Sequence, residues 1–360
     1  MKSKNQDFRI QNKKELPCHL YRTRLLKLDK LVIKITLECV ANCIACERRR
    51  KKYKSIINEK NKELELEDYK KLLEDSKKLG LKTVTISGGE PTMSNKCINL
   101  IKIIKNLNLY CIINTNGFKL SEIAKKIIDY NVDEVIISID SLNDKTHDNL
   151  RKCNGLWEKA TSSIKLLDKL RNEKKSKLKI VVRSILSKYF IKELPNLIRF
   201  ANELGIDDWM LDYVEADFNK KRLLPTKKEI IIFRKEILPR LITNILNENY
   251  EITKKKQLIK EAKKILYFQN MSDKNITRGI YRKKGLFNSC DYPKHFALIY
   301  PNGKVWPCIG LDYKKEDVMG NLFNQDIKNI FYGKLYRKFR KKHTSWCIYC
   351  PKQGVRFKFR

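Results

Sequence analysis

Seven of the eleven cysteines fall into two groups whose spacing suits metal or iron–sulfur ligation. The first group is Cys39, Cys43 and Cys46, which have C-x3-C-x2-C spacing. Three thiolates this close together can hold three irons of a [4Fe–4S] cluster and leave the fourth iron open to a small chelating molecule. A zinc ion would need a fourth ligand, and the loop contains no histidine. The spacing therefore favours a cluster with an open iron, with zinc as the alternative.

The second group lies near the C-terminus. Cys290 is followed after twelve residues by Gly303 and then after four residues by Cys308, and Cys347 and Cys350 form a later C-x2-C pair. Two cysteines that flank a turn and two from a later loop can close a site of four thiolates. Such a site holds either a structural zinc ion or an iron–sulfur cluster.

The elements that must position these cysteines alternate along the chain. Short β-branched runs separated by helical patterns predict six strands, at 31–37, 83–87, 109–114, 134–140, 179–186 and 208–214. The alternation predicts an α/β fold with a parallel sheet and right-handed crossovers, either doubly wound or barrel-like. In both cases ligands bind at the carboxyl ends of the strands. The first cysteine group and the segments SGGEP, NTNG and SIDS all follow strand ends, so we expect the site there.

The rest of the chain divides into three further segments. Residues 1–30 are an N-terminal extension, and residues 218–285 predict Lys-rich helices without a strand, as a linker or insertion. From residue 286 to 360 the pattern changes, and FALIY and KVWPC around an Asn-Gly turn predict a β-hairpin. The main α/β segment is therefore expected to end near residue 217. Within it, Ser121 is expected to cap a helix over 121–130.

The first cysteine group resembles the hallmark of the radical S-adenosylmethionine (SAM) superfamily, because Ser87-Gly88-Gly89-Glu90-Pro91 follows one βα unit later. The resemblance implies a partial (βα)6 TIM-like barrel in which SAM binds the open iron. It also implies that the two glycines let the backbone approach the methionine ammonium and that Glu90 adds negative charge. The implied reaction is reductive cleavage of SAM to a 5′-deoxyadenosyl radical, which abstracts a hydrogen atom from the substrate.

Further segments resemble the same family in the expected order. The implied SAM contacts are Pro91, Asn116, Ser138, Asp140, Arg151, Arg183 and Ser184. The resemblance implies that Ser138 and Arg151 bind the SAM carboxylate, and an arginine can bind a carboxylate through two parallel hydrogen bonds. It implies that Arg183 and Ser184 on the fifth strand contact the ribose or the carboxylate of SAM. One position departs from the family, because Ala45 replaces the usual aromatic residue before the third cysteine. The apolar floor under adenine must then come from elsewhere, and Ile44 is the candidate.

The second cysteine group resembles the SPASM/twitch extension of radical SAM enzymes, and Gly320-Asn321-Leu322 echoes a segment of that extension. The resemblance implies a small C-terminal α+β cysteine-rich domain. No cysteine follows Cys350, so we expect the shorter twitch form with one auxiliary [4Fe–4S] cluster. Four protein thiolates leave no open iron, which favours electron transfer over substrate binding.

The resemblance implies oxidative modification, either dehydrogenation or cross-linking, of a ribosomally made peptide. The alternative is a twitch-type dehydrogenase or epimerase of a small metabolite such as an aminosugar. Asp212 and Glu215 are candidate bases for proton removal, although ordinary surface acids would look the same. An epimerase would need a thiol hydrogen donor, for which Cys111 and Cys153 are candidates. A flavodoxin- or ferredoxin-like protein is the expected electron donor.

The net charge of +37 raises the question of nucleic-acid binding. Lysine, isoleucine and asparagine are abundant together, however, and lysines spread over nearly every predicted helix face. No basic stretch carries the interleaved aromatics of a base-stacking surface. We therefore expect no nucleic-acid partner, and an acidic substrate stays open, with the run RRRKK at 48–52 as its docking surface. A zinc-stabilised, basic RNA-binding protein is the alternative of another class.

The chain has no stretch of about 18 uncharged apolar residues, which a membrane span would require. Its first residues also lack the apolar segment of a secretory signal. We therefore expect a cytoplasmic protein without a membrane partner, where disulfides are rare. The four scattered cysteines, Cys18, Cys97, Cys111 and Cys153, are expected to be small buried residues.

Overall fold

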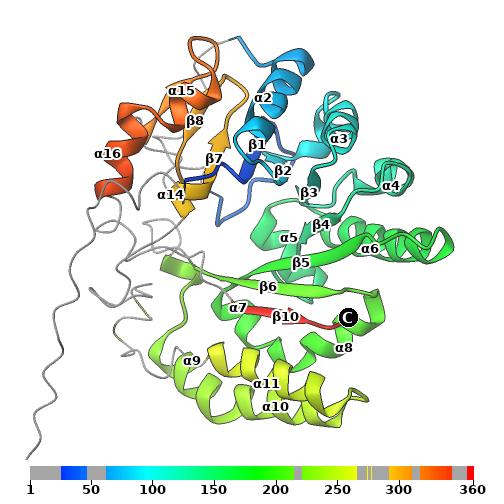
Figure 1. The fold of residues 1–360 in the computed structure, drawn as a ribbon. Coiled ribbons are helices and arrows are strands. Elements are labelled where there is room, and N and C mark those ends of the chain that lie inside the picture. The colour runs from blue at the N-terminus through cyan, green and yellow to red at the C-terminus, as the bar shows by residue number, and fades with distance from the viewer. Residues whose placement is uncertain are drawn as a thin grey trace, which may run out of the picture.

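The computed structural model describes residues 26–46, 62–214, 221–265, 274, 277, 292–309, 317–342 and 355–360. Its centre is one sheet with the strand order β10-β6-β5-β4-β3-β2-β1-β7-β8-β9. The six predicted strands are confirmed as β1 (Lys30–Thr36), β2 (Thr83–Gly88), β3 (Tyr110–Thr115), β4 (Glu134–Ser138), β5 (Lys179–Leu186) and β6 (Asp208–Tyr213). Consecutive strands pair in parallel. The sheet curves without closing, which confirms the partial-barrel prediction (Figure 1).

Helices cover the outer side of this sheet, as Figure 1 shows for α2, α3, α4 and α6. The helices of this segment are α2 Leu66–Lys78, η2 Pro91–Met93, α3 Cys97–Asn106, α4 Leu120–Asp129, α5 Asp144–Arg151, α6 Leu156–Glu173, α7 Lys188–Ile191, η3 Leu194–Asn196 and α8 Leu197–Leu204. The predicted cap at Ser121 is wrong, because α4 already begins at Leu120. The Leu120 side chain is fully buried, whereas Ser121 is exposed, so core packing sets the start of this helix.

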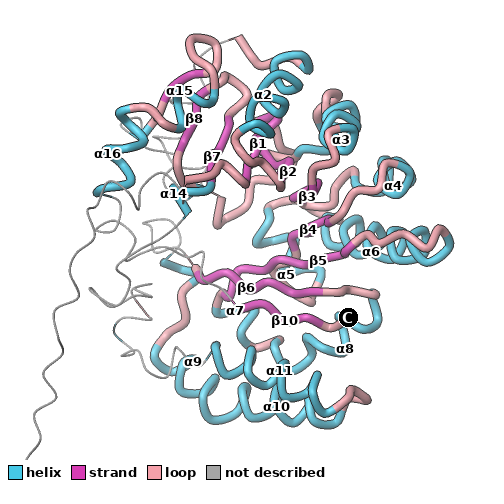
Figure 2. Tube along the Cα trace, viewed as in Figure 1, coloured by secondary structure: helices cyan, strands magenta, loops and turns pink. Residues whose placement is uncertain are grey.

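Residues 221–265 are helical, as predicted, and comprise η4 (Lys221–Leu223), α9 (Lys227–Ile232), the π-helix η5 (Phe233–Ile237), α10 (Leu238–Asn247) and α11 (Ile252–Ile265). Figure 2 shows these helices beside β6 and β10. Leu241, Ile245 and Leu258 are fully buried within the main core. These helices therefore pack as part of the barrel's outer layer and do not merely link two parts of the chain.

The predicted C-terminal hairpin is confirmed as β7 (Phe296–Ile299) and β8 (Lys304–Trp306), joined through Asn302-Gly303 and followed by β9 (Gly320–Asn321). The helices of this part are α14 (Tyr292–His295), α15 (Ile327–Phe331) and α16 (Lys334–Lys342). β7 pairs in parallel with β1, and β10 (Val355–Lys358) pairs antiparallel with β6. The C-terminal part thus continues the barrel sheet at both of its edges.

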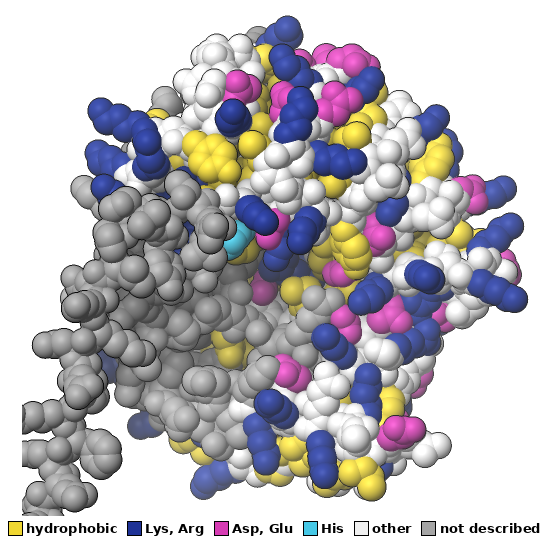
Figure 3. Space-filling model, viewed as in Figure 1, with side chains coloured by type: hydrophobic (Ala, Val, Ile, Leu, Met, Phe, Trp, Pro, Cys, Tyr) yellow, Lys and Arg dark blue, Asp and Glu magenta, His cyan; other side chains and the backbone are white. Residues whose placement is uncertain are grey.

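The surface of the molecule is basic without a single dominant patch on the face shown in Figure 3. Lysine and arginine side chains are scattered over the described surface there, with aspartate and glutamate between them. This agrees with the predicted spread of lysines over many helix faces. Across the described residues, no helix combines the length and apolar character that crossing a membrane requires.

Candidate cofactor site at the carboxyl ends of the strands

The first cysteine loop follows β1 and lies against the last turn of α5. The Asn42 N–H donates to the carbonyl of Arg151 at 3.1 Å, and the Ile44 N–H donates to the carbonyl of Leu150 at 2.8 Å. Cys39, Cys43 and Cys46 are all half-buried. Because α5 offers unpaired carbonyls at its C-terminal end, the loop amides can satisfy them and fix the loop on the helix. The three thiols are thereby held at the end of β1, as predicted.

The two glycines of SGGEP lie directly beside the start of this loop. The Gly89 N–H donates to the carbonyl of Thr36 at 2.8 Å, and the Glu90 N–H donates to the carbonyl of Glu38 at 2.7 Å. A Cβ atom on Gly88 would lie 2.4 Å from the Thr36 oxygen, and one on Gly89 would lie 2.0 Å from the Glu38 oxygen. Only glycine allows such an approach of two backbones. SGGEP therefore holds the residue that precedes Cys39.

The Glu90 carboxylate joins the loops after β2 and β3. One of its oxygens accepts from the Thr115 hydroxyl at 2.6 Å, and the other accepts from the Asn116 N–H at 2.6 Å. Thr92 donates to it through both its N–H and its hydroxyl. Burial raises the pKa of Glu90, and these hydrogen bonds oppose that rise. Both Glu90 oxygens accept hydrogen bonds from the protein, so the negative charge predicted near SAM also holds the loops after β2 and β3 together.

Asn116 lies between Glu90 and the first cysteine. Its side-chain nitrogen is 3.5 Å from the Sγ atom of Cys39, and its side-chain oxygen accepts from the Phe118 N–H at 2.8 Å. The Asn116 side chain is buried. NTNG thus reaches the cysteine loop through a side chain, a contact that sequence reasoning did not foresee.

Asp140 and Arg151 form a buried ion pair, with 2.7 Å between Asp140 Oδ2 and Arg151 Nε. Arg151 Nη1 lies 3.8 Å from the Sγ atom of Cys43, and Asp140 Oδ1 accepts from the Ile185 N–H at 3.0 Å. Burial opposes the charge of Arg151, but the two neighbouring anionic groups outweigh it and raise its pKa. Burial raises the pKa of Cys43 to about 11, and Arg151 counteracts that rise. The arginine therefore favours the thiolate form that iron requires.

His147 contacts the backbone of Asp140 and so supports the Asp140–Arg151 pair. Its Nδ1 atom accepts the Asp140 N–H at 3.1 Å, and its side chain is fully buried. Burial and the nearby Arg151 charge lower its pKa to about 3. The imidazole is therefore neutral, with its proton on Nε2. A helical His-Asp-x-x-Arg spacing was the only sequence signal for this role.

Arg183 and Asp212 pair across β5 and β6. Arg183 Nε donates to Asp212 Oδ2 at 2.7 Å. The register places Arg183 beside Ser138 of β4, so these two predicted SAM contacts are neighbours. Ser184 lies on the other face of β5, where its hydroxyl accepts from Trp209 Nε1 at 2.8 Å. Side chains alternate along a strand, so the side chains of Arg183 and Ser184 point to opposite faces of β5, and the Ser184 contact with SAM stays a prediction. Asp212 is engaged by the guanidinium, while Glu215 lies outside the described residues.

An apolar cluster adjoins the cysteine loop. Ile44 is buried in it, and Ala45 packs at its edge. The other members come from α5, from β5 and from the segments that follow β6: Leu150, Ile185, Val214, Leu223 and Leu224. The replacement of an aromatic residue by Ala45 is thus accompanied by aliphatic side chains from several elements. Ile44 as the adenine floor stays a prediction.

Several predicted residues lie apart from this site or outside the described residues. Cys308 is half-buried beyond β8, near Tyr336, whose hydroxyl donates to the carbonyl of Trp306 at 3.5 Å. Cys97 and Cys111 are buried as predicted, whereas Cys153 is only half-buried. Cys111 cannot deliver hydrogen to a substrate, because its side chain lies on β3 and is fully buried in the main hydrophobic core. Outside the described residues lie Cys18, the 48–52 run, Cys290, Cys347 and Cys350.

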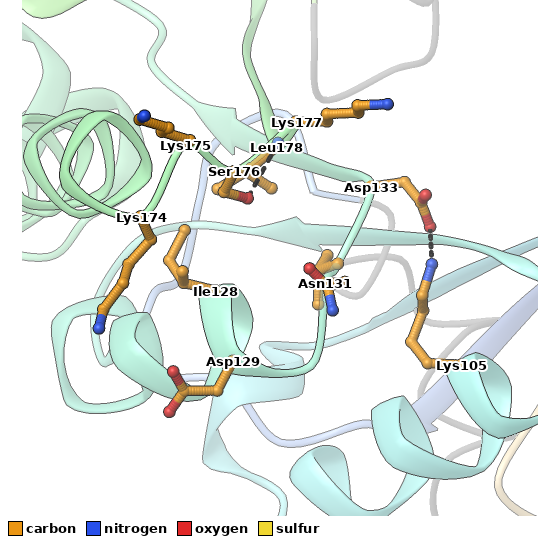
Figure 4. Close-up of a pocket in the computed structure, with 11 residues that line it drawn as sticks. Lys105, Ile128, Asp129, Asn131, Asp133, Lys174, Lys175, Ser176, Lys177 and Leu178 are labelled. Carbon is orange, nitrogen blue, oxygen red and sulfur yellow. Dashed lines mark hydrogen bonds and ion pairs between the residues drawn. The ribbon is translucent and has the colours of Figure 1, made fainter.

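A cavity of about 470 Å³ lies at the opposite end of the sheet. Figure 4 shows its lining at the turns that lead into β4 and β5 and at the end of α3, where four lysines, Lys105, Lys174, Lys175 and Lys177, line the hollow together with Asp129 and Asp133. One of them, Lys105, pairs with Asp133 at 2.6 Å. Parallel α/β folds place their chemistry at the carboxyl ends of strands, so this hollow at the amino ends does not belong to the cysteine site.

Residues 33–201 match the radical SAM superfamily, and residues 290–351 match an iron–sulfur cluster-binding (SPASM) domain. The chain therefore belongs to the radical SAM superfamily and is an enzyme with a C-terminal SPASM domain. This overturns the alternative of a non-catalytic, zinc-stabilised RNA-binding protein. The superfamily domain implies a [4Fe–4S] cluster with SAM, and the SPASM domain implies auxiliary iron–sulfur ligation.

Similar proteins cover most of the chain. The AdoMet-dependent heme synthase of Methanosarcina barkeri is 24% identical over 315 residues, which are 85% of this chain and 83% of that protein. Two structures of Streptococcus suis SuiB, one bound to SAM and one to its precursor peptide SuiA, are 18% identical with a TM-score of 0.62. They cover 93% of this chain and 74% of SuiB. A SAM-bound structure of anSMEcpe is 17% identical with a TM-score of 0.59, covering 91% and 85%. These structures share the fold.

The residues present at the strand ends fit the cluster and SAM. Gly88 and Gly89 lie so close to the backbone of Thr36 and Glu38 that a Cβ atom on either glycine would clash with it. Among the described residues, no three His, Cys, Asp or Glu side chains are placed to share a single metal ion. Zinc would draw its sulfurs to about 3.8 Å from one another, given bonds of about 2.3 Å, whereas each thiolate of a four-iron cluster binds a different iron. The donor set on the loop, three cysteines without a histidine, suits the cluster.

Proposed function

We propose that this enzyme cleaves SAM reductively and uses the resulting 5′-deoxyadenosyl radical to abstract hydrogen from a ribosomally made peptide, which is then dehydrogenated or cross-linked. The observation that carries the proposal is the single assembly at the strand ends, in which SGGEP and NTNG hold Cys39 and α5 holds Cys43. The cluster and SAM supply the radical chemistry when bound. The chain supplies the thiolates, the glycine backbone beside them and the charges around them.

Residues of the chain are proposed to bind different parts of SAM. Gly88 and Gly89 are proposed to let their backbone carbonyls approach the methionine ammonium of SAM. Arg151 and Ser138 are proposed to bind its carboxylate, and Arg183, held by Asp212, is proposed to face the ribose. Because Asp212 is already paired, we propose that it positions Arg183 and does not act as the base.

The peptide assignment is supported by the SuiB structure that holds a precursor peptide and matches 93% of this chain. The small-metabolite alternative is supported by the heme synthase, which matches 85% of this chain and more than four-fifths of its own length. Auxiliary cluster ligation at Cys290, Cys308, Cys347 and Cys350, with a role in accepting an electron from the substrate radical, is part of the proposal. So are a flavodoxin- or ferredoxin-like donor and a cytoplasmic location, where thiols stay reduced.

The first test is anaerobic reconstitution followed by iron and sulfide counting and a 5′-deoxyadenosine assay. We expect roughly eight irons per chain for two four-iron clusters. Replacing Cys39, Cys43 and Cys46 together by alanine should remove about half of the iron and all SAM cleavage. The matched control is Cys153→Ala, which belongs to neither cysteine group and should retain both. Full 5′-deoxyadenosine production by the triple variant would contradict the proposal.

The second test separates peptide from small-molecule substrates. Pooled extract peptides, the same pool digested with a protease, and a peptide-free small-molecule extract are each added to the reconstituted enzyme. Peptide substrates predict that only the undigested pool stimulates SAM cleavage and yields a product lighter by two hydrogens. Stimulation that survives digestion, or that the small-molecule extract alone produces, would favour the small-molecule alternative.

A further inference from the structure

Two of the three cysteine sulfurs at the proposed SAM-cleaving site face a side-chain N–H donor that comes from another element, the loop after β3 for Cys39 and the end of α5 for Cys43. We infer that Asn116 and Arg151 donate hydrogen bonds to the Cys39 and Cys43 thiolates of the bound cluster and raise its reduction potential. The inference depends on cluster binding and is independent of whether the substrate is a peptide. It adds to Arg151 a role towards the cluster besides its proposed contact with SAM.

The geometry around Asn116 orients its amide group. The side-chain oxygen accepts the Phe118 N–H at 2.8 Å, which leaves the nitrogen to face Cys39 Sγ at 3.5 Å. The backbone N–H of Asn116 is held by Glu90 at 2.6 Å, and the side chain is only 6% exposed. The amide can therefore neither rotate freely nor exchange the sulfur for water. Its N–H is committed to the thiolate.

The geometry around Arg151 is equally constrained. Asp140 holds its Nε atom at 2.7 Å, and Nη1 then lies 3.8 Å from Cys43 Sγ. The backbone carbonyls of Leu150 and Arg151 hold the loop on either side of this cysteine. Arg151 and Cys43 are thus held together by two kinds of contact. The guanidinium contacts the sulfur, and the amides on either side of Cys43 donate to backbone carbonyls of α5. In the described part of the chain, no comparable side-chain donor faces Cys46.

A hydrogen bond to a cluster sulfur stabilises the more negative, reduced state, because the added electron increases charge on the sulfurs. Donors to charged groups are also stronger than neutral pairs, and burial strengthens them further. Both donors should therefore make the cluster easier to reduce. Without them, the same electron donor would leave a smaller fraction of the enzyme reduced.

The experiment is a redox titration of the reconstituted full-length holoenzyme, followed by EPR of the reduced cluster before SAM is added. The signal that changes on later addition of SAM identifies the SAM-cleaving cluster among any others. For Asn116→Ala we expect about a tenfold lower ratio of reduced to oxidised cluster at a fixed potential, a shift of about 59 mV to more negative values. Arg151→Met should shift it in the same direction.

Two matched controls accompany these variants. Asn95→Ala removes an exposed amide elsewhere, and Lys152→Gln removes an exposed cation beside Arg151. Neither should move the midpoint. Midpoints for Asn116→Ala and Arg151→Met that equal the controls would overturn the inference, even if SAM cleavage were impaired.

A second substitution covers the case in which Asn116→Ala fails to hold iron. Asn116→Asp keeps the size and the acceptor for the Phe118 N–H but replaces the donor by a carboxylate. It should lower the potential more than alanine does. A potential unchanged or raised by Asn116→Asp would contradict the inference, while an unchanged iron count in that variant would leave the proposed cluster site intact.

Discussion

Two largely buried arginines lie at opposite ends of the barrel, and their surroundings differ. Arg171, at the amino ends of the strands, is 6% exposed in its side chain and donates five hydrogen bonds, to Asp168, Asp207 and the carbonyls of Leu178 and Gly205. These bonds match the five N–H groups of a guanidinium. At the carboxyl ends, Arg151 contacts Asp140 and Cys43 among the described residues.

The difference teaches how to tell a structural arginine from a functional one. A guanidinium whose donors are all taken by the fold has nothing left for a ligand, so Arg171 holds together the turns that lead into β5 and β6. Arg151 has donors left over, and its partner is a sulfur of a predicted cluster ligand. The side chains of Arg151 and Arg171, which are 13% and 6% exposed, respectively, thus differ in their capacity to bind a ligand, and substitutions at the two ends should separate stability from activity.

Arg171→Met should have the largest effect on stability. It leaves Asp168 and Asp207 partly buried without their main countercharge, which typically costs about 3–5 kcal/mol for a buried pair. Urea unfolding followed by circular dichroism measures the loss. The control is Arg360→Met, because Arg360 also reaches Asp168, at 3.1 Å, but is about half exposed. That variant should lose less than about 1 kcal/mol. Equal losses for the two variants would contradict the role assigned to Arg171.

The double variant Asp140→Asn, Arg151→Met should invert this pattern. Removing both charges together leaves no isolated buried ion, so the free energy of unfolding should change by less than about 2 kcal/mol. SAM cleavage should fall about 10- to 100-fold, the usual cost of losing a partner that supports a metal site. Circular dichroism and 5′-deoxyadenosine formation give the two readouts. A folded double variant with wild-type cleavage would show that Arg151, like Arg171, is merely structural.

The fold of the main segment could be predicted because each element carries its own local signal. β-Branched runs such as KIVVRSIL and amphipathic helices alternate with the periods of strand and helix, and all six predicted strands are present. The pairing of β7 with β1 and of β10 with β6 could not be predicted. Those contacts join residues more than a hundred positions apart, and no local pattern encodes them. The start of α4 was missed for a related reason, since burial of Leu120 overrides the capping preference of Ser121.

The candidate site was predictable where a residue type is required by chemistry, and less so where only geometry decides. The cysteine triad and Gly88-Gly89 have no chemical substitutes, so their spacing indicates their place. Ser184 is a different case, because a serine on a strand can serve either face, and only the packed Trp209 shows which one. Glu193 holds the loop after β4 through Ser141 and Leu142, yet nothing in its local sequence distinguishes it from a surface acid.

His147→Asn should test the support beneath Arg151 through its pH dependence. The folded protein keeps His147 neutral down to a pKa of about 3, whereas the unfolded chain takes up a proton below about pH 6.5. Stability from this group is therefore complete above pH 6.5 and is lost as the pH falls. Between pH 6.5 and 5 the wild type should lose about 2 kcal/mol relative to the variant. Asparagine keeps an acceptor for the Asp140 N–H, so parallel unfolding curves at all pH values would refute a buried neutral imidazole.

Lys175→Gly should give the smallest effect, at the cavity end of the barrel. Lys175 adopts a left-handed conformation with φ of 49°, which costs a side-chain-bearing residue about 1 kcal/mol. Glycine removes that cost but adds freedom to the unfolded chain, so the net gain should be about 0.5 kcal/mol. The matched control is Lys174→Gly, where φ is −93° and only the unfolded-state penalty remains, so that variant should be destabilised. Because both residues line the cavity far from Cys39, neither change should alter SAM cleavage, and a loss in both would mean that the amino ends of the strands take part in the reaction (Figure 4).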